Sequence, residues 1–346
     1  MDYQLLHQLV QTPGVSGREE KVRALVADQF QQIGAEMRTD AMGSLIGHLP
    51  GSGPRVALVA HMDEIGFLVS KIETTGFVRV MPVGGIDPRV FGAQKVVIHG
   101  RRDLPGIVGS IPPHMLKKGN GAESKEALPI AESFIDPGLP PEEVNALVRV
   151  GDPVTFGTDG WENDHAFFAK ALDDRVGLFA MLTAARRAAK RGCDLYLIAS
   201  TQEEYGLRGA GPAVFGVQPH IVLALEGTVA SDTPGLKLPA NTLATVQGKG
   251  PEIRLSDRAM LSHRPLVDFL TGLAEGAGIP HQLIVKNTGA TDAAISQIVG
   301  VGVKACALSV PTRYLHAPVA MVCKADVDHT IALVVAFLEK ADTMDP

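Results

Sequence analysis

Apolar and polar positions alternate along the chain in blocks that predict helices and strands in turn. From residue 170 onward, a helical pattern over 174–190 leads into the apolar run 193–200, and this order recurs to the C-terminus. The runs HIVLALE (220–226) and VKACALSV (303–310) are almost wholly apolar, which is typical of strands buried on both faces. The alternation therefore predicts an α/β fold with a mostly parallel sheet sandwiched by helices.

The first 65 residues have the same character. A nearly continuous apolar strand is predicted over 55–60. Before it, Ser16 is followed by Glu19 three residues later and then by apolar residues at helical spacing, a pattern typical of a capping box. We therefore expect a helix that starts at Ser16.

Between these two parts, the pattern of apolar and polar residues changes. Short β-rich pieces such as GFVRVMPVGG and QKVVIHG are punctuated by Gly and Pro and interrupted by a polar loop over 117–126. This pattern predicts a small all-β unit over residues 66–165. It would interrupt a discontinuous α/β domain formed by residues 1–65 and 166–346.

Composition and charge narrow the class of protein. The chain has 346 residues, of which 45 % are hydrophobic and 20 % charged, so it can bury a sizeable core. A net charge of −6 without a dense Lys/Arg cluster disfavours a nucleic-acid partner. No run approaches the ~18 apolar residues of a membrane span, and the N-terminus lacks the pattern of a signal peptide. Three widely spaced cysteines without a CxxC motif indicate free thiols, so we expect a cytoplasmic protein with no membrane partner.

Histidines and carboxylates follow several of the predicted strands. In open α/β sheets, ligands bind at the carboxyl ends of the strands, so these side chains are expected to meet at one edge. They are His61 and Asp63 after the strand 55–60, Glu203 and Glu204 after 193–200, Glu226 at the end of 220–226, and His316 after 303–310, together with Asp173 and Asp174 at the start of the helix 174–190.

Each of these residues alone has an ordinary structural explanation. Asp173 and Asp174 can serve as an N-cap and a first-turn acid, and a pair of glutamates can favour a helix dipole. A histidine after a strand is more often a hydrogen-bonded structural residue than a ligand. Glu226 fits such an explanation least well, because an ionised side chain at the end of a buried strand is costly unless it is paired or binds a metal. Five coincidences at equivalent strand ends favour a shared site.

The chemistry that suits this set is a two-metal centre. Imidazole and carboxylate ligands suit Zn, Co or Mn, and no cysteine belongs to the set. Two metals need a shared carboxylate between them, and one further carboxylate must stay free to accept the proton of the attacking water. The neighbours Glu203 and Glu204 can divide these tasks. The chain has neither the HExxH motif of single-zinc peptidases nor the GxSxG motif of serine hydrolases.

A set of motifs resembles a known family. They are PGVSGREEKVR (13–23), HMDEIGF (61–67), ALDDRVG (171–177), QEEYGLRGA (202–210), LEGT (225–228), TGATDA (288–293) and LHAP (315–318). In this order they resemble the tetrahedral (TET) or glutamyl aminopeptidase family of dinuclear metallopeptidases, over essentially the whole chain. The resemblance implies a zinc-peptidase-like α/β domain with a dimerisation domain inserted in it. It also implies dimers that assemble into a twelve-subunit shell.

The resemblance further implies a role for each candidate residue. One metal would be held by His61, Asp173 and Glu226, and the other by Asp173, Glu204 and His316, so that Asp173 bridges. Glu203 would be the general base and acid, and Asp63 would orient His61. The peptide bond between Asp173 and Asp174 is expected to be cis. Asp174 then remains a first-turn acid of its helix.

One departure from the family pattern and two sets of alternatives concern the metal and the substrate. Many family members have Asp where this chain has Glu226, and the extra methylene can change the metal spacing, the metal preference or the shape of the first substrate pocket. Zinc is expected first, with cobalt or manganese as alternatives. A preference for acidic N-terminal residues would need a cation in that pocket, and four arginines are open candidates: Arg254, Arg258, Arg264 and Arg313.

Three functions compete for this site. The first is a metal-dependent aminopeptidase that acts on peptides and depends on their free α-amino group. The second keeps the site but makes the protein a deacylase or a carboxypeptidase-like amidohydrolase, which would cleave N-acetylated substrates equally well. The third is an assembly protein whose metals only hold the fold, which would not need Glu203.

Overall fold

The computed structural model describes residues 1–110 and 128–344. The polar loop predicted over 117–126 lies outside the described residues. None of the described helices is both long enough and apolar enough to cross a membrane. Cys193 and Cys306 are buried, Cys323 is partly buried, and all three are free thiols, as the sequence indicates.

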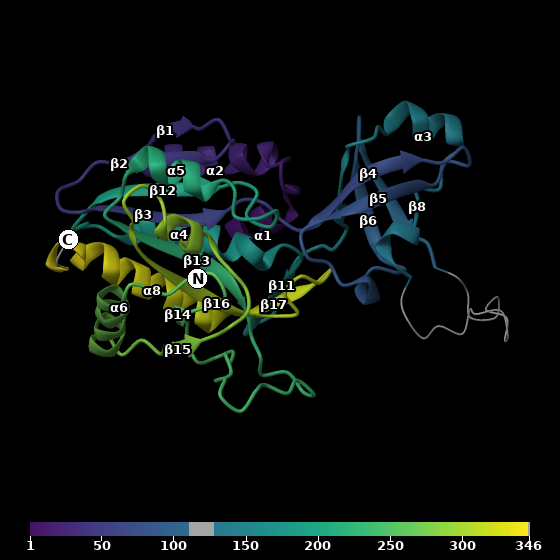
Figure 1. Ribbon diagram of the computed structural model, residues 1–346. Coiled ribbons are helices and arrows are strands. Elements are labelled where there is room, and N and C mark those ends of the chain that lie inside the picture. The colour runs from purple at the N-terminus through teal and green to yellow at the C-terminus, as the bar shows by residue number, and fades with distance from the viewer. Residues whose placement is uncertain (111–127, 345–346) are drawn as a thin grey trace.

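One large sheet forms the body of the molecule (Figure 1). Its eleven described strands run in the order β1-β2-β12-β3-β13-β16-β17-β11-β10, and β14 and β15 attach through β16. Their bounds are β1 (Glu36–Thr39), β2 (Leu45–Leu49), β3 (Arg55–His61), β10 (Trp161–Glu162), β11 (Ala166–Ala169), β12 (Asp194–Ser200), β13 (Ile221–Val229), β14 (Glu252–Ser256), β15 (Gln282–Val285), β16 (Lys304–Arg313) and β17 (Ala320–Cys323).

The centre of this sheet is parallel and its margins are antiparallel. Strands β12, β3, β13 and β16 pair in parallel, with Ser200 opposite His61 and Glu226 opposite Ser309. Antiparallel pairings add β1 and β2 on one side and β17, β11 and β10 on the other. Because the central strands are parallel, their carboxyl ends meet at one edge, as the sequence predicts.

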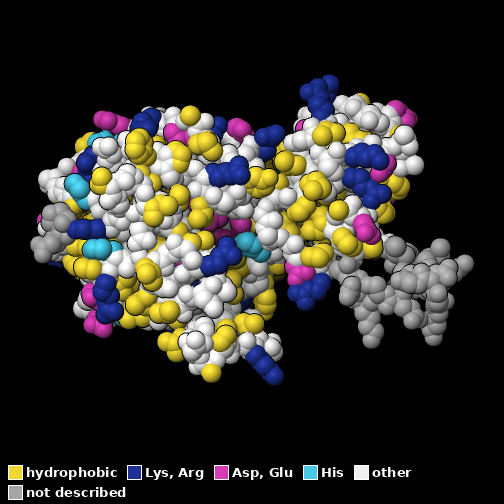
Figure 2. Space-filling view, viewed as in Figure 1, with side chains coloured by type: hydrophobic (Ala, Val, Ile, Leu, Met, Phe, Trp, Pro, Cys, Tyr) yellow, Lys and Arg dark blue, Asp and Glu magenta, His cyan; other side chains and the backbone are white. Residues whose placement is uncertain are grey.

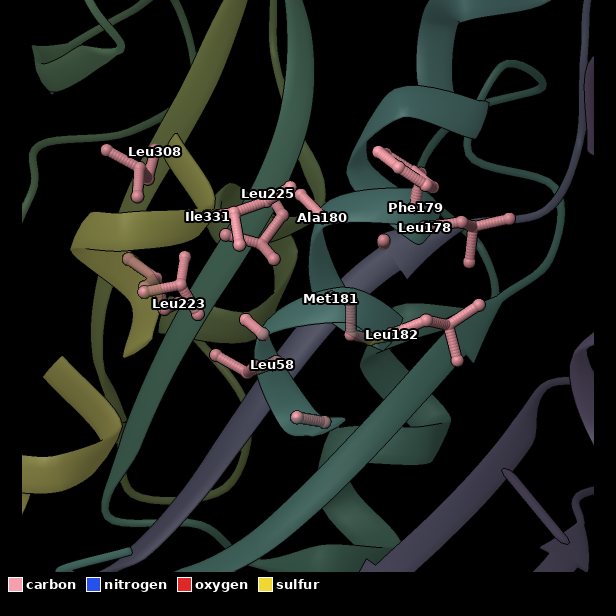
Figure 3. Close-up of a cluster of buried hydrophobic side chains, with 14 of the residues drawn as sticks. Leu58, Leu178, Phe179, Ala180, Met181, Leu182, Leu223, Leu225, Leu308 and Ile331 are labelled. Atoms are coloured by element: carbon pink, nitrogen blue, oxygen red, sulfur yellow. The ribbon is translucent and has the colours of Figure 1, made fainter. Parts of the chain in front are cut away.

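Helices cover both faces of the sheet. One face carries α1 (Gln4–Gln11), α2 (Glu20–Ile33), α4 (Leu172–Arg187), α6 (Arg264–Gly276) and α8 (Lys324–Lys340), and the other carries α5 (Ala210–Val217) and α7 (Asp292–Gln297). The strands are apolar on both sides, so alternate residues fill two separate cores. Figure 3 shows the larger core, in which strand residues Leu58, Leu223, Leu225 and Leu308 meet Leu178, Phe179, Ala180, Met181 and Leu182 of α4 and Ile331 of α8.

A closed β-barrel stands apart from the sheet and has its own core (Figure 1). Its strands are β4 (Gly66–Ile72), β5 (Val78–Val83), β6 (Lys95–His99), β7 (Asp103–Val108), β8 (Ile135–Asp136) and β9 (Pro153–Phe156). The inserted unit also contains the helix α3 (Pro141–Leu147), so the prediction of an all-β unit is wrong here. This helix begins with a proline and two acids, as helix starts commonly do. Short 3-10 turns lie at Pro88–Val90, Ile130–Glu132 and Ala341–Thr343.

The predicted capping box at Ser16 is wrong. Helix α2 begins at Glu20, and no side-chain hydrogen bond caps it. The Ser16 hydroxyl instead donates to Asp63, and the Glu19 carboxylate accepts from the backbone N–H of Gln202. Each side chain thus has a partner from a distant part of the sequence in place of the reciprocal contacts of a capping box.

Candidate metal centre

Two candidate residues lie at the ends of neighbouring parallel strands. His61 is the last residue of β3, and Glu226 lies in β13 beside it. The register of the two strands places both side chains at the same edge, where His61 Nε2 is 3.9 Å from Glu226 Oε2. Sheet pairing alone therefore brings these two groups together.

Asp173 lies between two histidines. Its Oδ1 is 3.3 Å from His61 Nε2, and its Oδ2 is 3.6 Å from His316 Nε2. The peptide bond that joins Asp173 to Asp174 is cis, which confirms the expectation drawn from the resemblance. A carboxylate whose two oxygens face two different imidazoles has the geometry that a bridging ligand needs.

The turn after β12 brings two glutamates to the same place. Glu204 Oε1 lies 3.4 Å from His316 Nε2, and Glu203 Oε2 lies 3.8 Å from His61 Nε2. The backbone N–H groups of both glutamates donate to the carboxylate of Asp63, each over 3.0 Å. Asp63 thus orders the turn that presents both glutamates.

Asp63 also lies beside the first histidine. It is fully buried, and His61 Nδ1 is 3.1 Å from its backbone oxygen and 3.5 Å from its Oδ1. When Nδ1 of a histidine is engaged in this way, Nε2 is left facing the opposite direction, here toward Asp173.

The neighbouring Asp174 has a different environment. Its Oδ1 accepts from the backbone N–H of Gly177 over 3.0 Å, three residues on, as an N-cap does. Its Oδ2 accepts from the backbone N–H of His61 over 3.2 Å. The non-helical backbone of Asp173 and Asp174 places the regular part of α4 after them. These contacts agree with a structural role for Asp174 at the start of its helix.

The two sides of the cluster differ in exposure. The side chains of His61 and Glu226 are 1 % and 3 % exposed, whereas that of His316 is 35 % exposed. On the face seen in Figure 2, acidic and histidine side chains lie in a recess between the sheet and the barrel. The cluster is therefore buried on its His61 side and open to solvent on its His316 side.

Crowding of carboxylates shifts their pKa values. Burial and the neighbouring acids raise the pKa of Glu203 and of Glu226 well above its usual value, and burial together with the charge of Asp173 raises that of Glu204 to about 7. Burial lowers the pKa of His316, but its contacts with Asp173 and Glu204 outweigh this and raise it to about 9. Several ionised carboxylates in one buried place repel one another, and a bound cation would relieve this repulsion.

The residues fit a bound divalent metal. Three groups have ligand atoms within 4.8 Å of one another: His61, Asp173 and Glu226; Asp173, Glu204 and His316; and His61, Glu203 and Glu204. Asp173 is common to the first two groups. Glu204 Oε1 is buried and accepts no hydrogen bond from the described residues, which is costly unless something else satisfies it. Imidazole and carboxylate are suitable donors for Zn, Co or Mn.

Two contacts at this centre were not found from the sequence. The backbone N–H of Asp292 donates to Glu226 Oε1 over 3.1 Å. The buried carboxylate of Asp292 accepts a hydrogen bond from the hydroxyl of Ser200. The motif TGATDA contains Asp292, but its spacing gave no indication of this role. The carbonyl of Gly85, between β5 and the next turn, accepts from His316 Nδ1 over 2.9 Å. Nothing in the local pattern around Gly85 points to the centre.

The four arginines proposed for the first substrate pocket have other environments. Three of them are in ion pairs, Arg254 with Glu252 and Asp257, Arg264 with Asp268, and Arg313 with Asp232, while Arg258 is exposed. These pairings give no support to an acidic preference.

Comparison with known proteins gives a consistent answer. The family model described as M42 glutamyl aminopeptidase matches residues 43–333. A lysyl aminopeptidase of Pyrococcus furiosus is 35 % identical over all of this chain and 99 % of its own length. The structure of an aminopeptidase from the archaeon Desulfurococcus kamchatkensis is 35 % identical, covers 99 % of this chain and 97 % of its own, and superposes with a TM-score of 0.92. A Pyrococcus horikoshii TET1 peptidase that can assemble into a tetrahedron or a large octahedral shell is 30 % identical over 97 % of this chain and 98 % of its own, with a TM-score of 0.86.

Proposed function

Because this chain belongs to the M42 glutamyl aminopeptidase family, we propose that the strand-end cluster is the active site with which it removes N-terminal residues from peptides. The protein is a metal-dependent aminopeptidase, a hydrolase of peptide bonds. The observation that carries the assignment of the site is the position of the Asp173 carboxylate, with one oxygen toward His61 and the other toward His316.

The proposed ligand sets follow the two groups that share Asp173. His61, Asp173 and Glu226 hold one divalent ion, and Asp173, Glu204 and His316 hold the other. Glu226 Oε1 already accepts the N–H of Asp292, so Oε2 is the oxygen that is free to bind metal. Zinc is the proposed ion, with cobalt or manganese as alternatives.

Glu203 is the proposed general base and acid. Its carboxylate belongs to neither of the two groups that share Asp173, yet it lies 3.8 Å from His61 and is largely buried. A carboxylate in this position can accept a proton from the attacking water and return it to the leaving amine. Burial raises the pKa of this carboxylate above its usual value, which is the direction that lets a carboxylate hold and return a proton.

The other residues prepare this step. Asp63 orders the backbone of Glu203 and Glu204 and lies beside His61, so one buried carboxylate supports both halves of the centre. Metal ions held here would polarise the scissile carbonyl and bind the free α-amino group of the substrate, which would restrict cleavage to N-termini.

The inserted barrel is proposed as the dimerisation domain of an assembly of twelve subunits. The TET1 peptidase of similar structure forms a tetrahedron or a larger octahedral shell, which supports a closed assembly here. The three free thiols favour a reducing compartment, and we propose the cytoplasm. Light scattering on the purified protein measures the assembly, and a stable monomer would contradict it.

The site assignment is tested by the replacement Glu203→Gln. Glutamine keeps the shape and cannot accept the proton, so kcat should fall by about 10²–10⁴-fold while the metal-to-protein ratio stays that of the wild type. The assay uses aminoacyl arylamides with metal-free enzyme refilled with Zn, Co or Mn separately. An N-acetylated substrate should not be cleaved.

Three results would contradict the proposal. If Glu203→Gln retained the wild-type kcat, Glu203 would not be the general base. Loss of metal together with activity would make Glu203 a ligand. Equal cleavage of free and N-acetylated substrates would favour a deacylase or carboxypeptidase-like amidohydrolase.

A further inference from the structure

The segment between α1 and α2 makes two buried contacts with the candidate active site. The Ser16 hydroxyl donates to Asp63 Oδ2 over 2.6 Å. Glu19 Oε1 accepts from the backbone N–H of Gly17 over 2.7 Å and from that of Gln202 over 3.1 Å. Both side chains are buried. The two residues that resemble a capping box in the sequence thus point toward the turn that carries Glu203.

That turn is held through three successive backbone N–H groups. Gln202 donates to Glu19, and the next two residues donate to the two oxygens of Asp63. Gln202 has φ +54°, a left-handed conformation that residues other than glycine adopt only when the surroundings hold them there. Glu19 therefore binds the residue at which the chain makes this unfavourable turn.

We propose that Glu19 is a positioning residue for Glu203. It fixes the peptide between Thr201 and Gln202, one residue before the base, and so contributes to the direction in which the side chain of Glu203 leaves the turn. The inference rests on the proposed function, in which Glu203 moves the proton. Proton transfer is sensitive to such placement, since a shift of about 1 Å in a reacting group can cost about 10²-fold in rate.

The roles of Glu19 and Asp63 are separable. Asp63 holds the N–H groups of Glu203 and Glu204 and lies beside His61, so its loss would disturb base and ligands alike. Of the three N–H groups of this turn, Glu19 holds only that of Gln202, and its other partner is the N–H of Gly17 in its own segment. Without Glu19, the metal ligands keep their supports while the turn loses the contact at Gln202.

The test compares four variants at two adjacent acids. Glu19→Ala removes the acceptor, Glu19→Gln keeps an oxygen in the same place, Glu19→Asp withdraws it by one methylene, and Glu20→Gln changes the charge at the exposed neighbour as a matched control. For each variant, kcat, KM, the metal-to-protein ratio and hydrogen exchange of the segment 201–209 in the metal-free enzyme are measured.

Positioning predicts a specific order. Glu19→Ala should lower kcat about tenfold or more with KM within about twofold, with an unchanged metal ratio and with faster exchange over 201–209. Glu19→Asp should resemble it, Glu19→Gln should recover most of kcat, and Glu20→Gln should match the wild type. If Glu19→Ala does not fold, the comparison of the other two variants provides the same test, because the kcat of Glu19→Gln should exceed that of Glu19→Asp.

Several outcomes would overturn the inference. Unchanged kcat and exchange in Glu19→Ala and Glu19→Asp would show that the turn needs no such support. A loss of kcat in proportion to metal would make Glu19 a support of the ligands. A Glu19→Gln variant as slow as Glu19→Asp would show that an acceptor oxygen in the same place is not enough, and a Glu19→Gln variant slower than Glu19→Asp would make charge, not the hydrogen bond, decisive. These outcomes are distinct from a failure of the proposed function, which Glu203→Gln reports by itself.

Discussion

The two sides of the proposed metal centre are built in different ways. On the inner side, His61 and Glu226 lie on adjacent parallel strands, are almost fully buried, and are held by the backbone N–H of Asp292 and by contacts with Asp63. On the outer side, His316 lies in the loop after β16 and itself has a left-handed backbone conformation. Its side chain is partly exposed and donates to the carbonyl of Gly85, which belongs to the inserted part of the chain.

The difference shows how rigidity is distributed across the site. Strand register fixes the inner pair, because neither strand can shift without moving every side chain it buries. The outer histidine depends on a loop and on a contact from a segment far away in the sequence, and such positions adapt more easily. We therefore expect the inner ion to be bound more tightly and the outer ion to exchange first.

Removal of the carboxylate that both ligand sets share should abolish the difference in metal binding between the two sides. It has the largest expected effect on activity. Asp173→Ala takes a ligand from both proposed sets, so both ions should be lost and kcat/KM should fall at least about 10³-fold, given that a single electrostatic contact in an active site is often worth 10²–10³-fold. The measurement is the metal-to-protein ratio of the purified variant, together with arylamide hydrolysis.

Asp174→Asn is the matched control for this replacement. It changes the adjacent acid, whose oxygens accept from Gly177 and His61 rather than facing both histidines. We expect some loss of thermal stability, on the order of 1 kcal/mol, because one acceptor is replaced by a donor, but two ions per subunit. If Asp173→Ala keeps an ion, or if Asp174→Asn loses both, Asp173 is not the bridge.

The residues at the strand ends show what the sequence could predict. The apolar strands placed His61, Glu203, Glu204, Glu226 and His316 at one edge, because period and burial are local properties and parallel strands share a carboxyl end. The α/β fold with an inserted β unit followed from the same patterns. The resemblance, rather than spacing, supplied Asp173 as the bridge.

What could not be predicted depends on contacts between distant segments. Ser16 and Glu19 fit a capping box locally, and only their partners Asp63 and Gln202 show otherwise. The contact of Gly85 with His316 is likewise invisible in the sequence, because a backbone carbonyl leaves no residue preference behind. Local patterns thus predict which side chains meet at this edge, but not the backbone groups of Asp292 and Gly85 that hold them.

An intermediate effect is expected from His316→Ala, which removes one ligand of the outer set only. The variant should retain about one ion per subunit and lose roughly 10²-fold in kcat, since the inner set is intact and one electrostatic contribution is gone. During dialysis against a chelator, wild-type enzyme should release its ions in two steps, and only the slower step should remain in the variant. Two retained ions, or none, would contradict the division into two sets.

The smallest effect is expected from Gly85→Ala, which tests the contact with the inserted segment. An added Cβ at this position would meet His316 Nδ1 at 3.3 Å, so the ring must move by a few tenths of an ångström and its hydrogen bond to the Gly85 carbonyl weakens. Partners that orient a metal-binding histidine are commonly worth about 10–100-fold in metal affinity, and we expect about tenfold for the outer ion with no change for the inner one. Gly92→Ala, in the same insertion but with open space around its Cβ, is the matched control. Equal weakening of both ions would mean that the insertion supports the centre as a whole, and the distinction between a sheet-built side and a loop-built side would then fail.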